Sequence, residues 1–148
     1  MTQEDKKLLI TDLCARLPYG VKAESVFINP DTKEHKSCGI EVFDATSILM
    51  IRDGLGEFKP YLFPLSSMTE EQMEELEELC NMYTPDDDYH PYAYMGIEVL
   101  YKHVLDDGYK FSSAFNTDVV DWFNKKHFDY RGLIEKGLAI DATNKNIY

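Results

Sequence analysis

The hydrophobic positions near the start of the chain recur with the spacing of a helix. They are Ile10, Leu13, Cys14 and Leu17, which form one apolar stripe. Thr2 precedes the first turn as a candidate N-cap. We therefore predict an N-terminal helix that packs this stripe, Cys14 included, against a core.

Strand-like patterns follow between about residues 21 and 65. The runs 21–28 and 36–43 are separated by the turn sequence NPDT, which has proline at its second position. Alternation within the second run sets Ile40 and Val42 on one face. These two runs predict neighbouring antiparallel strands, because the connection between them is short.

Two further runs complete the predicted sheet. The run ILMI, residues 48–51, is apolar on both faces, which is typical of a central buried strand. The run 57–65 contains Pro60 and Pro64, and proline cannot donate to a sheet ladder, so this run favours an edge strand. The four runs together predict a roughly four-stranded antiparallel meander.

Helical spacing returns in the second half of the chain. Residues 66–83 predict a helix that begins with a capping box of Thr69 and Gln72. A third helix is predicted over 91–105 and a fourth from about residue 117. The expected fold is α+β: an N-terminal helix on the antiparallel meander, followed by three or more helices, in one domain over residues 1–148.

Composition narrows the class of protein. The formal net charge is −12, from 27 acidic and 15 basic residues, which argues against nucleic acid as a partner because phosphate binding relies on Lys and Arg. The three cysteines are far apart and form no C-x-x-C pair, which suits a reducing compartment. Neither a signal peptide nor a membrane span is recognisable. We expect a cytoplasmic protein without a membrane association.

Glutamates cover most of the predicted helix at 66–83. This pattern indicates either a solvated helix face or an acidic surface that imitates a phosphate row and blocks a basic partner. The candidate partner-binding residues are Glu70, Glu71, Glu74, Glu75 and Glu78.

The cluster DDDYH contains the strongest candidates for a metal site. Asp86, Asp88 and His90 offer oxygen and imidazole ligands to a divalent ion. The cluster lacks the alternating spacing and the central glycine of a calcium loop, so a solvated acidic loop is the competing interpretation. No cofactor-binding motif and no framed nucleophile is present, so the sequence predicts neither a cofactor nor a catalytic residue.

The stretch HFDYRGLIEKGL, residues 127–138, gathers residue types that enzymes use, but each has a structural role available. Asp129 can cap a following short helix by accepting from the backbone N–H of Arg131 or Gly132. Phe128 or Tyr130 should anchor the turn against the core. We expect His127 to be exposed, and the Arg131 guanidinium to bind an acidic group elsewhere. The stretch is therefore predicted to be a structural corner composed of His127, Phe128, Asp129, Tyr130 and Arg131.

Three segments carry a resemblance to known proteins and make up about a third of the chain: DKKLLITDLCARLPYGVK, KPYLFPLSSMTEEQ and HFDYRGLIEKGLA. They resemble a family of short uncharacterised proteins found in prophage and mobile-element gene sets of gut anaerobic bacteria. Residues 83–116 depart from the family pattern and are a candidate insertion. The resemblance implies a bacterial, cytoplasmic, accessory protein, and it carries over no activity, cofactor or catalytic residue.

These observations rank three functions. The first is a non-enzymatic accessory or protein-interaction protein of a bacterial mobile element. The alternative is an acidic inhibitor or immunity-type protein that blocks a basic partner, and a metal-dependent enzyme comes third.

Overall fold

The computed structural model describes residues 1–81 and 117–148. The elements are the helices α1 (Gln3–Arg16), α2 (Ala45–Asp53), α3 (Glu70–Asn81) and α5 (Thr117–Lys125), the 3-10 turns η1 (Leu17–Tyr19) and η2 (Leu65–Ser67), and the strands β1 (Lys22–Ile28), β2 (His35–Val42), β3 (Gly56–Leu62) and β4 (Ile140–Asp141). The predicted helix at 91–105 and the candidate insertion at 83–116 lie outside the described residues.

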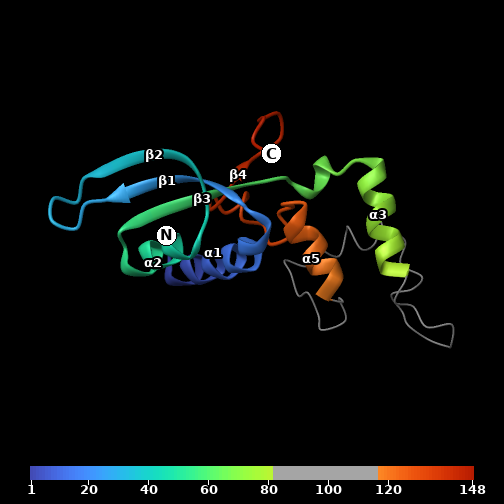
Figure 1. Cartoon of the computed structure of the whole chain (residues 1–148), viewed down its shortest axis with the longest axis horizontal. Coiled ribbons are helices and arrows are strands. Elements are labelled where there is room, and N and C mark those ends of the chain that lie inside the picture. Colours follow the sequence, from blue (N-terminus) through green and yellow to red (C-terminus); the bar gives the residue numbers. More distant parts are fainter. Residues whose placement is uncertain (82–116) are drawn as a thin grey trace.

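The four strands form one mixed sheet in the order β2-β1-β3-β4. β1 pairs with β2 and β3 in antiparallel fashion, whereas β4 joins β3 in parallel. α1 and α2 lie on the same side of this sheet, and α3 and α5 lie beyond its end (Figure 1). The α+β prediction with an N-terminal helix is confirmed. The purely antiparallel meander is wrong, because the fourth strand of the sheet, β4, comes from the C-terminal segment and pairs in parallel with β3.

The predicted central strand at 48–51 is the helix α2. Asp44 is its N-cap: its carboxylate accepts from the Ser47 backbone N–H at 2.8 Å, and the Asp44 backbone N–H donates to Ser47 Oγ at 3.3 Å. Gly54 ends the helix at φ 71°, a left-handed conformation that glycine adopts without steric cost. A short apolar run fits a buried helix as well as a strand, and here the two caps decide in favour of the helix.

β3 is an edge strand only over part of its length. Its first residues pair with β1 alone, but Tyr61 and Leu62 also pair with β4. Pro60 lies opposite Ala23 in the antiparallel ladder. The edge prediction therefore holds for the segment that contains Pro60 and fails for the two residues after it.

The described residues contain two hydrophobic clusters. The first lies between the sheet and its covering helices and includes Leu9, Leu13, Val21, Phe58, Leu62 and Leu133. The second joins α3 and α5 and is formed by Leu65, Leu76, Val119, Phe123, Phe128 and Tyr130. Of the predicted α1 stripe, Leu13 belongs to the first cluster and Ile10 and Leu17 pack against it. Cys14 is exposed, so its predicted burial is wrong, and the polar residues Asp12 and Arg16 of the same helix are buried.

The helix predicted over 66–83 is confirmed as α3, with its capping box. The Thr69 backbone donates to Gln72 Oε1 at 2.9 Å, and the Gln72 backbone donates to Thr69 Oγ1 at 3.3 Å. The fourth predicted helix is confirmed as α5. Within the described ranges, none of the helices combines the length and the apolar character that a membrane crossing requires.

Candidate functional site

A fully buried ion pair lies where the two hydrophobic clusters meet. Asp12 and Arg16 are one turn apart on α1, and neither side chain is accessible to solvent. Arg16 Nε donates to Asp12 Oδ2 at 2.7 Å, and Nη2 donates to Oδ1 at 3.0 Å. This two-bond geometry is the one in which a guanidinium best satisfies a carboxylate, and it compensates for the loss of hydration.

The same guanidinium connects α1 to α5 and to the segment that follows it. Arg16 Nη2 donates to the Phe128 carbonyl at 2.8 Å, and Nη1 lies 3.5 Å from the Phe123 carbonyl. Arg131 approaches Asp12 as well, with its Nη1 at 3.7 Å from Oδ1. The predicted acidic partner of Arg131 is therefore Asp12. The guanidinium carbons of Arg16 and Arg131 lie 5.3 Å and 4.9 Å from the centroid of the Tyr130 ring.

α5 ends in a Schellman motif. The Phe128 N–H donates to the Phe123 carbonyl at 3.0 Å, and the His127 N–H donates to the Asn124 carbonyl at 3.2 Å. His127 takes the left-handed position of the motif at φ 59°, where glycine is the usual residue. Phe128 is buried against Phe123, a hydrophobic contact that often accompanies this motif. The motif thus turns the chain back toward the sheet.

His127 is buried, so the expectation of an exposed histidine was wrong. Its ring stacks on Tyr148 with the centroids 4.0 Å apart, and its Nδ1 is buried without a hydrogen-bond partner among the described residues. Burial and the nearby charges of Arg16 and Lys22 lower the pKa of His127 to about 4. The imidazole is therefore neutral at pH 7, and the positively charged form is disfavoured in this position.

The stability of the protein should fall between pH 6.5 and pH 4 because His127 must become protonated on unfolding. The pKa of His127 is about 4 in the folded chain and 6.5 in the unfolded chain, so the unfolded state binds more protons across this window. We expect a loss of up to about 2 kcal/mol by pH 5 from this group. Urea unfolding at several pH values measures it.

The matched control is His127→Asn. Asparagine tolerates a left-handed backbone and does not titrate in this window, whereas the other acidic and basic groups remain in both proteins. The variant should show a shallower dependence of the unfolding free energy on pH. Equal slopes for the two proteins would mean that His127 does not carry the effect.

Asp129 holds the next turn of the chain from a buried position. Its carboxylate accepts from the backbone N–H of Leu133 at 2.9 Å and of Ile134 at 2.7 Å. The predicted acceptor role is present, but the donors lie two residues further along, and a series of turns replaces the predicted short helix. Burial raises the pKa of Asp129, and the two N–H donors act in the opposite direction.

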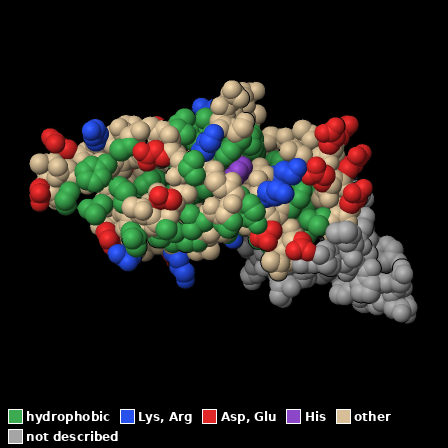
Figure 2. Space-filling view, viewed as in Figure 1, with side chains coloured by type: hydrophobic (Ala, Val, Ile, Leu, Met, Phe, Trp, Pro, Cys, Tyr) green, Lys and Arg blue, Asp and Glu red, His purple; other side chains and the backbone are tan. Residues whose placement is uncertain are grey.

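The acidic face of α3 is partly used within the fold. Glu75 accepts from Trp122 Nε1 at 3.1 Å and pairs with Lys126 Nζ at 2.7 Å, both on or beside α5. Lys126 and Trp122 lower the pKa of Glu75. The other four candidates point to solvent, and acidic side chains gather over α3 in Figure 2. They are Glu70, Glu71, Glu74 and Glu78.

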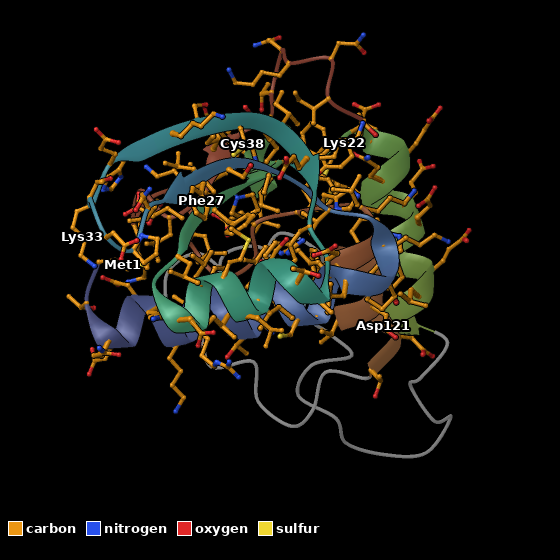
Figure 3. The ribbon with its side chains drawn as sticks, turned by 60° about the vertical axis from the view of Figure 1, so that its left-hand side comes forward. Met1, Lys22, Phe27, Lys33, Cys38 and Asp121 are labelled. Carbon is orange, nitrogen blue, oxygen red and sulfur yellow. The ribbon has the colours of Figure 1, made fainter. Side chains whose placement is uncertain are left out.

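β2 forms an exposed edge of the sheet that the sequence patterns did not single out as a site. Every residue of β2 except Gly39 is exposed, and within the described part of the chain β2 pairs only with β1. Ile40 and Val42 are 52% and 58% exposed, high values for large apolar side chains. Figure 3 shows Cys38 on this outer strand and Lys33 in the turn that joins it to β1.

The proposed metal ligands Asp86, Asp88 and His90 lie outside the described residues. In the remainder of the chain, residues 1–81 and 117–148, no three His, Cys, Asp or Glu side chains gather in a way that could hold a metal ion. The described polar clusters are engaged in structural bonds, as shown above for Asp12, Asp129 and Glu75.

Comparisons with models of protein families, with curated proteins and with solved structures found no match.

Proposed function

We propose that the chain is a non-enzymatic protein-interaction protein, of the accessory kind that its resemblance to mobile-element proteins implies, and that β2 contacts the partner. The observation that carries the proposal is the exposure of Ile40 and Val42 side by side on an edge strand. Edge strands are normally protected from other chains, and an unprotected one favours association. The buried polar residues support the non-enzymatic interpretation, because the buried carboxylates of Asp12 and Asp129 both bind groups of the fold itself.

The alternative is an acidic inhibitor that uses α3 against a basic surface. Four exposed glutamates on one helix and the net charge of −12 favour it, because opposite charge speeds association. The ion pair between Glu75 and Lys126 leaves one carboxylate fewer on the acidic face of α3 for a partner. The two proposals place the partner on different surfaces, so substitutions can separate them.

We expect the partner to be lost when the apolar edge is made polar. The test protein carries Ile40→Thr and Val42→Thr, since threonine keeps the β-branched shape that suits a strand. The chain and this variant are used side by side to capture proteins from an extract of the source organism, with quantitative mass spectrometry. The proposal requires a specific partner whose recovery falls at least about tenfold, which corresponds to about 1.4 kcal/mol.

The control carries Glu71→Lys, Glu74→Lys and Glu78→Lys and leaves β2 unchanged. It should retain the partner, and both variants should keep the circular dichroism spectrum of the parent. Loss in the lysine variant alone would favour the acidic inhibitor. Equal recovery of the partner with the parent chain and both variants would show that the partner contacts neither β2 nor the acidic face of α3.

A further inference from the structure

The hydrogen-bonding alternation of the sheet shows which backbone groups of β2 face outward. The Phe43 N–H donates to the Val21 carbonyl at 2.9 Å, so Val21 and Phe43 form a hydrogen-bonded pair. Such pairs alternate with pairs whose N–H and C=O point away from each other. Lys22 pairs with Val42 and Glu24 with Ile40 in the same register. The N–H and C=O of Ile40 and Val42 therefore face away from β1.

Among residues 1–81 and 117–148, no strand pairs with these outward-facing backbone groups, and the two side chains are exposed. The first half of β2 is different, because a β-bulge at Cys38, next to Gly39 at φ 88°, and the charge of Lys36 protect it in the usual manner of edge strands. The unprotected edge is therefore the short segment 40–42. Four outward-facing backbone groups are complementary to one kind of occupant, an extended strand.

The side chains along this segment indicate the chemistry of that strand. Ile40 and Val42 lie on one face of the sheet, and Glu41 between them lies on the other, where its carboxylate accepts from the Ser25 hydroxyl at 2.9 Å. A neighbouring strand sets its residues directly opposite these three. Apolar residues would cover Ile40 and Val42, and a lysine or arginine opposite Glu41 would gain from the opposite charge.

The net charge favours a strand of another protein over a second copy of this chain as the occupant of segment 40–42. Two copies would each bring a net charge of −12 to the same contact, and like charges oppose association. A basic partner is attracted by the same charge. From the edge geometry and this charge we infer that segment 40–42 binds, by strand addition, an extended segment of another protein in which apolar and basic residues alternate. The inference rests on the proposed function and specifies how the partner is held.

The test uses the full chain and a short synthetic peptide of alternating valine and lysine. Backbone hydrogen exchange followed by NMR should show that the peptide slows exchange of the Ile40 and Val42 amides at least about tenfold. The same peptide with N-methylated backbone nitrogens on its pairing edge should give no protection, because it cannot form the ladder. A valine–glutamate peptide should bind at least about tenfold more weakly.

A backbone substitution provides the second arm. Val42→Pro removes an N–H that faces away from β1, so the β1–β2 ladder keeps its hydrogen bonds while the outer edge loses a donor. Glu41, the preceding residue, is already in a strand, which proline requires. The variant should keep the parent spectrum and ladder protection but bind the peptide at least about tenfold more weakly.

The possible results separate this inference from the function on which it rests. If the threonine variant loses the captured partner while Val42→Pro retains it, or if the N-methylated peptide protects as well as the parent peptide, the protein binds through β2 but not by strand addition. No protection by the valine–lysine peptide likewise overturns the strand chemistry. Protection of Ile40 and Val42 in the chain alone, rising with its concentration, would identify the occupant as a second copy.

Discussion

Arg16→Met should lower the free energy of unfolding by at least about 3 kcal/mol, because breaking a buried ion pair leaves a charge without its partner. Asp12 would keep a carboxylate that is closed to solvent, with only the more distant Arg131 nearby at 3.7 Å. The carbonyl of Phe128 would lose the 2.8 Å bond that Arg16 donates. Urea unfolding at pH 7, followed by far-ultraviolet circular dichroism, measures the change.

Two further proteins show whether the ion pair itself is responsible. Arg52 also lies on a helix, but its ion pair with Asp53 is exposed. Arg52→Met should therefore leave the unfolding midpoint unchanged. Asp12→Leu combined with Arg16→Met removes both charges and should recover part of the loss. A loss below about 1 kcal/mol for Arg16→Met alone would contradict the role assigned to this pair.

Phe128→Ala should be comparably damaging, with a loss of about 3–5 kcal/mol of unfolding free energy. Phe128 is almost completely buried and stacks on Trp122 with the ring centroids 5.7 Å apart. It also contacts Phe123 and Phe63, so its removal leaves a cavity in the α3–α5 cluster and weakens the Schellman motif. Urea unfolding gives the loss, and near-ultraviolet circular dichroism of Trp122 reports the altered stack.

The control is Phe27→Ala on β1. Phe27 is 36% exposed, so the same truncation opens no closed cavity and should cost far less. If Phe128→Ala were no more destabilising than Phe27→Ala, Phe128 would not be the anchor that its packing indicates. The two variants remove the same atoms, so the comparison isolates burial.

The capping residues were the most dependable signals in the sequence, and the hydrophobic runs were less so. Thr2 and Thr69 begin the helices that they were predicted to begin. The apolar run ILMI predicted a strand, which was wrong: Asp44 and Gly54 cap it as a helix. Four apolar residues in succession have no distinguishing period, so only the flanking residues could decide.

The functional surfaces were harder to predict because they depend on neighbours distant in the sequence. Periodicity placed Ile40 and Val42 on one face, but whether that face is covered depends on where the helices lie. The burial of His127 depends on Tyr148, and that of Arg16 on carbonyls up to 112 positions away. The spacing of Asp12 and Arg16, i and i+4, was a readable signal for an ion pair, but it could not show that the pair is buried.

The parallel pairing of β3 with β4 also constrains the order of folding during synthesis. β1, β2 and β3 follow one another along the chain and can pair while the later segments are still being made. β4 can join only after its own residues have been added, and the Tyr148 hydroxyl then bonds to the Tyr61 carbonyl, 87 positions earlier. Until that moment Tyr61 and Leu62, at the end of β3, lack the neighbouring strand that β4 supplies, and this part of the β3 edge is open to another chain. Contacts between chains on one polysome are therefore a greater hazard before β4 docks than afterwards.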